Sequence, residues 1–255
     1  MSRHFATAAA RSAVDLLRRD LAVAHRLIAH AGMDELVWNH ISARVGGGDG
    51  YLVTPGNKHF SVITPEDLVH VGHGEGHDDA QGLENITADV IHGAIYRARP
   101  DVHAIVHVHS ESGMYVSSLE GESPLKYYTQ DGGAFFGKVA WHDFEGVATD
   151  HDEQKRIHDD MTTKTPQGHL PEVLMMRQHG STCCGKSVGE AFVKNFYLDR
   201  VCRTQMNIDQ GGNRGVEVSD EILEKMSQQY CDPTLRHGCE WDAMVEYAET
   251  FLGWD

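Results

Sequence analysis

The stretch AIVHVHS, residues 104–110, places His107 and His109 one residue apart in an otherwise apolar, β-branched run. Side chains at positions i and i+2 of a β-strand point to the same face, so a strand here brings the two imidazoles together. Two neighbouring imidazoles form a natural bidentate site for a divalent metal. The spacing therefore predicts a metal site, with two exposed histidines on a half-buried strand as the alternative.

A third ligand must come from elsewhere in the chain, and His179 in RQHGST is the best candidate. This histidine ends another apolar run and precedes Gly180, where a turn can aim the ring inward. Three histidines that leave a fourth position open are typical of a catalytic metal site rather than a structural one. Imidazole ligands alone do not select the metal, because zinc, manganese, cobalt, nickel and iron all accept them.

Alternating helices and strands surround these histidines. Apolar spacing and stop signals predict one helix over residues 12–32, a second over 86–100, a third over 152–166 and a long one over 187–208. Strands are expected within residues 34–45, 51–56, 67–72, 104–110 and 171–180. This order indicates an α/β layered fold. Without repeats or a low-complexity linker, we expect a single domain over residues 1–255, with a core at about 12–210 and a helical tail at about 211–255.

Composition limits the partners and the compartment. The formal net charge of −16 argues against nucleic-acid and anionic-membrane partners, which need basic surfaces. No run approaches the roughly 18 apolar residues of a transmembrane helix, and the N-terminal segment has no apolar core of a secretory signal. The five cysteines are odd in number and form no CxxC pair, so we expect free thiols in a reducing cytoplasm.

Longer motifs carry a family resemblance. The stretch HGAIYRARPDVHAIVHVHS with the later RQHG resembles the class II aldolase/adducin family. LVWNHISARV, LVTPG, WHDFEGVATDHDE and HGSTCCGKSVGEAFVKNFYLDRVCRTQ extend the resemblance over about residues 15–210. It implies a three-layer α/β/α sandwich around a central, mainly antiparallel sheet. It also implies a homotetramer with active sites at subunit boundaries, and a divalent metal that is most often zinc, with manganese, cobalt or iron in some members.

The resemblance also suggests roles for individual residues. It makes His107, His109 and His179 the metal ligands. Asn39 stands where the family contacts the anionic end of the substrate, with Thr54 and Gly56 in the neighbouring loop. Tyr128 stands where sugar-phosphate aldolases of the family carry a tyrosine that donates a proton in a neighbouring subunit's site. Tyr127 is the adjacent alternative, and interface packing is the alternative role for both.

One departure from the family pattern matters. Its sugar-phosphate aldolases carry Ser-Ser-Glu on the helix before the HxH strand, and this chain has Ile86, Thr87 and Ala88 instead. Only Thr87 keeps a hydroxyl for substrate binding, and alanine cannot transfer a proton, so a phosphorylated sugar substrate is disfavoured. Within the family, the sequence most resembles the adducin-like subgroup, which also lacks the glutamate. Asp89, Glu84 and Glu111 are the candidates to replace it, the last because it shares the face of the histidine pair if the strand continues.

The expected chemistry follows from an open metal site. A metal acting as a Lewis acid stabilises the enolate or enediolate left when the bond beside a carbonyl breaks. That intermediate serves aldol cleavage and decarboxylation, and the missing glutamate favours decarboxylation, with Tyr128 as the acid. We therefore expect a metal-dependent carbon–carbon lyase acting on a small unphosphorylated hydroxy-carbonyl or hydroxy-aromatic acid. The alternatives are a non-heme iron oxygenase and a non-catalytic adducin-like binding module.

Overall fold

A seven-stranded sheet forms the centre of the computed structural model, which describes residues 13–46, 50–72, 85–212, 214–232 and 239–253. The strand order is β3-β2-β1-β4-β7-β6-β5. Every pair is antiparallel except β5 and β6, which run parallel. The predicted mainly antiparallel sheet is confirmed. The strands are β1 (His40–Arg44), β2 (Tyr51–Val53), β3 (Val69–Val71), β4 (Ala104–Val108), β5 (Val139–His142), β6 (Val173–Met176) and β7 (Gly180–Gly185).

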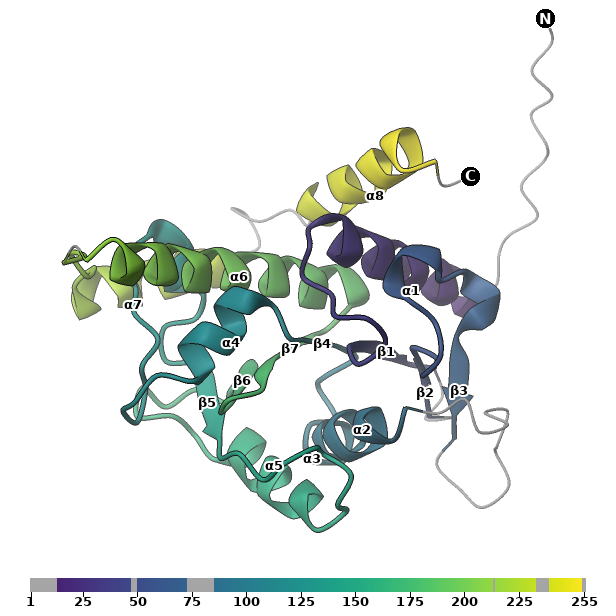
Figure 1. Cartoon of the computed structure of the whole chain (residues 1–255), viewed down its shortest axis with the longest axis horizontal. Helices are drawn as coiled ribbons and strands as arrows, with labels where there is room; N and C mark the ends of the chain where they lie inside the picture. Colours follow the sequence, from purple (N-terminus) through teal and green to yellow (C-terminus); the bar gives the residue numbers. More distant parts are fainter. Residues whose placement is uncertain (1–12, 47–49, 73–84, 213, 233–238, 254–255) are drawn as a thin grey trace, which may run out of the picture.

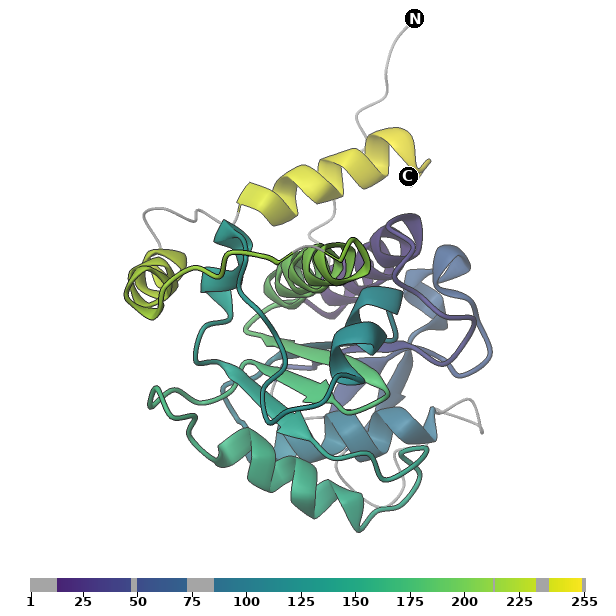
Figure 2. The same cartoon turned by 60° about the vertical axis from the view of Figure 1, so that its left-hand side comes forward.

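Helices cover both faces of the sheet, which gives the expected three layers (Figures 1 and 2). One face carries α1 (Ala13–His30), α4 (Glu111–Ser117) and α6 (Val188–Gln210), with α7 (Asp220–Cys231) and α8 (Cys239–Phe251) packed outside them. The other face carries α2 (Ile86–Ala88), a π-helical segment (Asp89–Gly93), α3 (Ala94–Ala98) and α5 (Glu153–Thr162). Short 3-10 turns occur at Phe60–Val62, Pro65–Asp67 and Gln130–Ala134.

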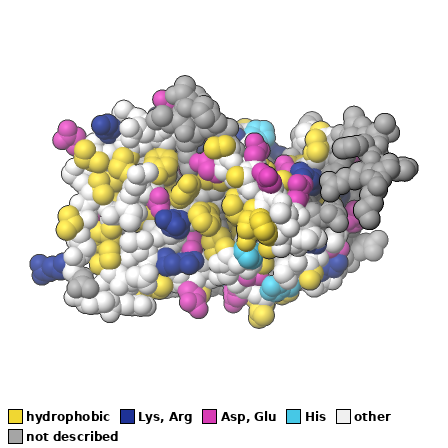
Figure 3. Space-filling model, turned by 90° about the horizontal axis from the view of Figure 1, so that it is seen from above, with side chains coloured by type: hydrophobic (Ala, Val, Ile, Leu, Met, Phe, Trp, Pro, Cys, Tyr) yellow, Lys and Arg dark blue, Asp and Glu magenta, His cyan; other side chains and the backbone are white. Residues whose placement is uncertain are grey.

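Strand β4 is buried on both sides because neighbouring side chains point to opposite layers. Val106 packs with α1 and α6 in one apolar core, whereas Ile105 packs with α3 and α5 in another. The even-odd alternation places His107 on the side of Ile105, facing the α2–α3 layer. Figure 3 views the opposite side of the molecule, over α8 and α6, where hydrophobic side chains lie scattered among charged ones.

Most predicted elements occur close to the expected positions. Helix α1 and the long helix α6 are confirmed, and the expected helical tail contains α7 and α8. The helix expected over 86–100 forms, although its middle turn is π-helical. Strands β5 and β7 and helix α4 were not predicted. Cys183, Cys184 and Cys202 are buried, and all five cysteines are free thiols, as expected.

One structural expectation is wrong. The strand that carries the histidine pair ends at Val108, and helix α4 begins at Glu111. Ser110 is the N-cap residue, because its side-chain oxygen accepts a hydrogen bond from Gly113 N. Glu111 therefore does not extend the strand face of His107. No helix within the described residues is long and apolar enough to span a membrane.

Candidate metal centre

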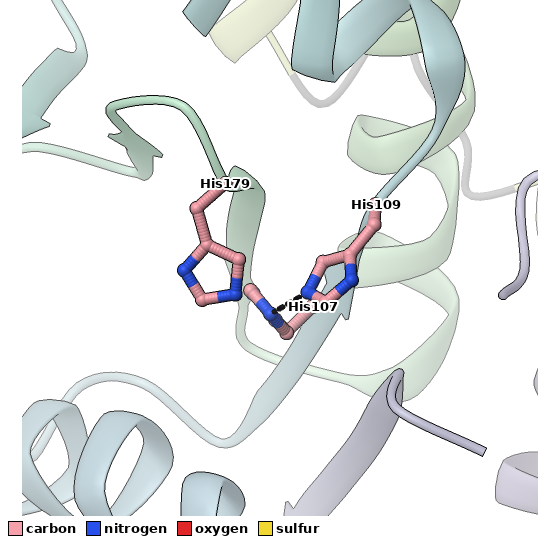
Figure 4. Close-up of side chains that lie close together, drawn as sticks. All are labelled: His107, His109 and His179. Carbon is pink, nitrogen blue, oxygen red and sulfur yellow. Dashed lines mark hydrogen bonds between the residues drawn. The ribbon is translucent and has the colours of Figure 1, made fainter. Parts of the chain in front are cut away.

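Three histidine rings converge at one end of the sheet (Figure 4). His107 lies on β4, His109 follows the end of that strand, and His179 lies in the turn between β6 and β7. One ligand atom from each ring falls within 4.8 Å of the other two. The Nε2 atoms of His107 and His109 are 2.9 Å apart. The structure thus brings together the three ligands expected from the sequence.

The turn that presents His179 depends on a glycine. A Cβ atom at Gly180 would lie 2.5 Å from the carbonyl oxygen of Val108 and 3.1 Å from Cδ2 of His109. Gln178, on the other side of His179, has a φ of 53°, a conformation that costs energy for a residue with a side chain. The close approach of this turn to β4 therefore requires Gly180.

Two of the three rings, those of His107 and His109, make a hydrogen bond through Nδ1. Nδ1 of His109 donates a hydrogen bond to Oε2 of Glu35 at 2.5 Å, because a carboxylate can only accept. The Thr182 hydroxyl donates its proton to the sulfur of Met176, so its oxygen accepts a hydrogen bond from Nδ1 of His107 at 2.9 Å. Both rings then carry a lone pair on Nε2. These two nitrogens lie at hydrogen-bond distance, 2.9 Å, and with neither protonated their lone pairs repel unless a cation is bound, so this donor set fits a divalent metal.

The pKa values of His107 and His179 favour the neutral imidazole. Burial, together with the neighbouring His40, His109 and His179, lowers the pKa of His107 well below its usual value. Burial, aided by His109 and His142, lowers the pKa of His179 to about 4. Neutral imidazole is the form that binds metal. These two rings are therefore ready to act as ligands at neutral pH.

A buried imidazole lies behind the metal ligands. His40 on β1 is the register partner of His107, and the two rings stack with centroids 4.6 Å apart. His40 is fully buried and uses both nitrogens: Nε2 lies 3.0 Å from Oγ1 of Thr87, and Nδ1 lies 2.8 Å from Nε2 of His92. The Thr87 hydroxyl donates to Oδ1 of Asn85 at 2.6 Å, so it must accept from His40.

That acceptor fixes the direction of the remaining bonds. His40 donates through Nε2, and because burial and the nearby His92 lower its pKa well below the usual value, its Nδ1 is an acceptor. Nε2 of His92 donates to that acceptor, and Nδ1 of His92 accepts from Ser42 Oγ at 2.6 Å. Ser42 in turn accepts from the hydroxyl of Tyr96 at 2.8 Å. The result is one continuous chain of hydrogen bonds with a single proton arrangement. We call it the buried chain, and its members are Tyr96, Ser42, His92, His40, Thr87 and Asn85.

Asn39 and Thr54, two predicted substrate contacts, lie in different environments. Oδ1 of Asn39 accepts from Glu35 N at 2.7 Å, whereas its Nδ2 is buried and has no hydrogen-bond partner within the described part of the chain. The Thr54 hydroxyl is fully buried and bonded to Nε2 of His25 at 2.6 Å and to Ile41 N at 2.7 Å. Asn39 therefore keeps a donor available for a ligand, while Thr54 holds the start of β1.

The other predicted site residues are dispersed. Thr87 belongs to the buried chain and reaches the triad through His40. Gly56 lies half-buried in the turn after β2, and Glu111 is exposed in the first turn of α4. Tyr128 is half-buried against Gly215, where a Cβ would lie 2.3 Å from its ring. Burial and the nearby Glu217 and Asp209 raise the pKa of Tyr128, which keeps its hydroxyl protonated.

The candidates to replace the absent glutamate are also separated. Ala88 is buried in the apolar core of the α2–α3 layer. Asp89 accepts from the hydroxyl of Tyr51 at 3.4 Å and lies 3.9 Å from His151. Glu84 lies outside the described residues. The carboxylate that does reach the triad, Glu35, was missed because a single acidic residue in a helix–strand loop gives no sequence signal.

A separate cavity of about 530 Å³ lies away from the triad, among α6, α7 and α8. Lys138, Glu172, Lys194 and Trp241 are among its lining residues, and none of the three histidines is. Lys194 and Lys138 on its wall both pair with Glu172, at 2.7 Å and 3.5 Å. The chemistry-bearing cluster is therefore the triad and not this cavity.

Comparison with known proteins agrees with the fold. Residues 19–206 match the model of the class II aldolase and adducin N-terminal domain. A Caulobacter vibrioides protein assigned to aldolase class 2 is 35% identical over 210 residues, which cover 81% of this chain and 78% of that protein. Decarboxylase NovR of Streptomyces niveus is 32% identical over 213 residues, covering 82% and 75%. The crystal structure of an aldolase II superfamily protein from Pseudomonas syringae superposes with a TM-score of 0.81 at 31% identity, covering 94% of each chain.

Proposed function

The chain belongs to the class II aldolase and adducin family, and on that premise we propose that it is a divalent-metal-dependent carbon–carbon lyase. Its substrate is a small unphosphorylated hydroxy-carbonyl or hydroxy-aromatic acid, and the reaction is aldol cleavage or decarboxylation. The observation that carries the proposal is the convergence of His107, His109 and His179 within 4.8 Å. Zinc is the proposed metal, with manganese, cobalt or iron as substitutes.

The three histidines would hold the metal. When bound, the metal would act as a Lewis acid on a substrate oxygen and stabilise the negative charge that develops there. Thr182 and Glu35 orient two of the rings through their Nδ1 atoms. The buried position of His107 and the low pKa of His179 keep protons from competing for these ligands.

Substrate binding and proton transfer are assigned to residues around the triad. Asn39 is proposed to donate its unpaired Nδ2–H to the anionic end of the substrate, next to the loop of Gly56. Thr54 and Thr87 are proposed to support the substrate site from within the protein, because hydrogen bonds inside the chain already use their hydroxyls. Tyr128 is the proposed proton donor, and its raised pKa means that the hydroxyl carries the proton it would donate.

Two further assignments accompany these. Glu111 is the proposed base for aldol cleavage, supported by its exposed position two residues after His109. Tyr128 is proposed to serve the site of a neighbouring copy in a homotetramer, since no described hydrogen bond or ring contact joins it to the triad of its own chain. Light scattering of the purified protein tests the assembly.

Metal content and activity test the proposal together. Elemental mass spectrometry of the purified protein is compared with that of a His107→Ala/His109→Ala variant. About one zinc, manganese or cobalt per chain, lost in the variant, supports the lyase and directs screening toward hydroxy acids. Release of carbon dioxide would indicate decarboxylation, and release of an aldehyde would indicate aldol cleavage. Iron with oxygen uptake would instead favour the oxygenase, and no metal after reconstitution would favour a binding module.

A further inference from the structure

The carboxylate of Glu35 is the only acidic group within the described residues that hydrogen-bonds to a triad histidine. It comes from the loop between α1 and β1, and it reaches across to His109, 74 residues later in the chain. Its side chain is 46% exposed and that of His109 is 13% exposed. Glu35 therefore stands at the open edge of the triad, between the metal ligands and solvent.

The loop holds Glu35 in this position by several bonds. The backbone N–H of Glu35 donates to the buried side chain of Asn39 at 2.7 Å, and its carbonyl accepts from Trp38 N at 3.1 Å. Leu36, the next residue, has a φ of 42°, which only glycine adopts without cost. A non-glycine residue keeps such a backbone only when its surroundings enforce it. The loop is thus built to direct the Glu35 side chain.

The helix on the other side of the triad offers no carboxylate at the matching place. Ala88 is apolar and 1% exposed, within the core under β4. Negative charge near the ligands therefore enters from the α1–β1 loop. A carboxylate that accepts from Nδ1 of a ligating histidine fixes the tautomer and makes Nε2 a stronger donor to the metal.

We propose that Glu35 is the positioning residue of the metal centre: it locks His109 with Nε2 facing the metal and raises the affinity of the site. This inference rests on the proposed metal-binding function of the triad. It assigns Glu35 a role through His109 and not through contact with substrate. Glu35 and Asn39 also become coupled, since the Asn39 side chain that holds the loop is the same one that offers a donor to the substrate.

Two variants separate charge from hydrogen bonding. Glu35→Gln keeps an acceptor for Nδ1–H but removes the charge, and Glu35→Leu removes both. We expect zinc dissociation constants, measured on metal-free protein by competition with a chromogenic chelator, to increase in the order wild type, Gln, Leu. Glu35→Leu should lower the affinity for zinc about 10- to 100-fold. Glu122→Gln, which removes an exposed carboxylate elsewhere, is the matched control and should bind like the wild type.

A second readout detects the positioning itself. In zinc-loaded protein with nitrogen-15-labelled histidine, the Nδ1–H of His109 should give a strongly deshielded proton signal that shifts in Glu35→Gln and disappears in Glu35→Leu. Circular dichroism of the metal-free variants checks that the fold is intact. Equal zinc affinity in wild type and Glu35→Leu would overturn this inference while leaving the metal site standing. A wild-type protein that binds no metal would overturn both.

Discussion

The imidazole of His40 stacks on that of His107, with ring centroids 4.6 Å apart and an interplanar angle of 23°. His107 is a proposed metal ligand, whereas His40 has both nitrogens committed to Thr87 and His92. A neutral ring whose two nitrogens are both used can neither bind metal nor take a proton from substrate. His40 therefore supports His107 as a packed surface, and the buried chain behind it keeps that surface in place.

The link between Thr87 and His40 should be needed for stability. Thr87→Val leaves the Nε2–H of the buried His40 without an acceptor, which is expected to cost about 1–3 kcal/mol in free energy of unfolding. Urea titration followed by circular dichroism measures this. Thr87→Ser keeps the hydroxyl and should stay within about 1 kcal/mol of the wild type. Equal stability of the Val and Ser variants would show that the bond contributes nothing.

Zinc should stabilise the folded protein through the triad. A ligand that binds only the native state at a free concentration 100 times its dissociation constant adds about 2.7 kcal/mol to the free energy of unfolding. We expect a higher thermal midpoint on adding zinc to metal-free wild type, reversed by a chelator. The His107→Ala/His109→Ala variant should show no such shift. A shift of the same size in this variant would place the zinc elsewhere.

Gly180 should be required for both packing and metal binding. A methyl group there would meet the carbonyl oxygen of Val108 at 2.5 Å, so the turn carrying His179 must move. Gly180→Ala is expected to cost about 1–3 kcal/mol in free energy of unfolding and to weaken zinc binding. Gly46→Ala is the matched control, because among the described residues no atom beyond its chain neighbours lies within 4 Å of the Cβ it would add. Unchanged zinc affinity in Gly180→Ala would mean that the turn absorbs the methyl group without moving His179.

His142 should make stability depend on pH. Burial alone would lower the pKa of this imidazole, but its bond to Asp160 at 2.7 Å and the nearby Glu153 raise it above the usual value. Because the folded-state pKa is raised, the stabilisation is complete below the unfolded pKa of about 6.5 and declines as pH rises through the folded value. The stability difference between wild type and His142→Gln should therefore be larger at pH 6 than at pH 9.

A companion substitution separates this effect from other titrations. Asp160→Asn removes the carboxylate that accepts the hydrogen bond from Nδ1 of His142. Like His142→Gln, it should lower stability more at pH 6 than at pH 9. Chemical denaturation at several pH values gives the free energies for all three proteins. A difference that grows from pH 6 to pH 9 would contradict the assignment of a stabilising imidazolium.

The histidine triad could be predicted because its signal is local. His107 and His109 lie on and just beyond one strand, and His179 stands before a glycine that marks a turn. Family resemblance supplied the layered fold around them. Strand β7 was missed because Gly180–Gly185 consists of small residues and has Thr182 as its one β-branched residue, whereas β-branched residues are what indicate strands.

The surroundings of the triad could not be predicted in the same way. Glu35 and His109 meet only because a loop and a strand end are neighbours in the folded chain. His40 looked like part of an ordinary strand, and nothing local indicates that it stacks on His107 or donates to Thr87. The strand face expected for Glu111 was wrong, because an apolar pattern does not mark where a strand ends and Ser110 starts a helix there instead.

His40, His107 and Thr182 are direct register partners in a row across β1, β4 and β7. Contacts between such distant chain segments form slowly, because the entropy cost of closing the long loops comes before the stabilising contacts can form. A metal ion therefore finds its ligands assembled only in molecules whose three central strands have already paired. Its binding energy should slow unfolding far more than it speeds folding, so that holding the metal would lengthen the lifetime of the native state.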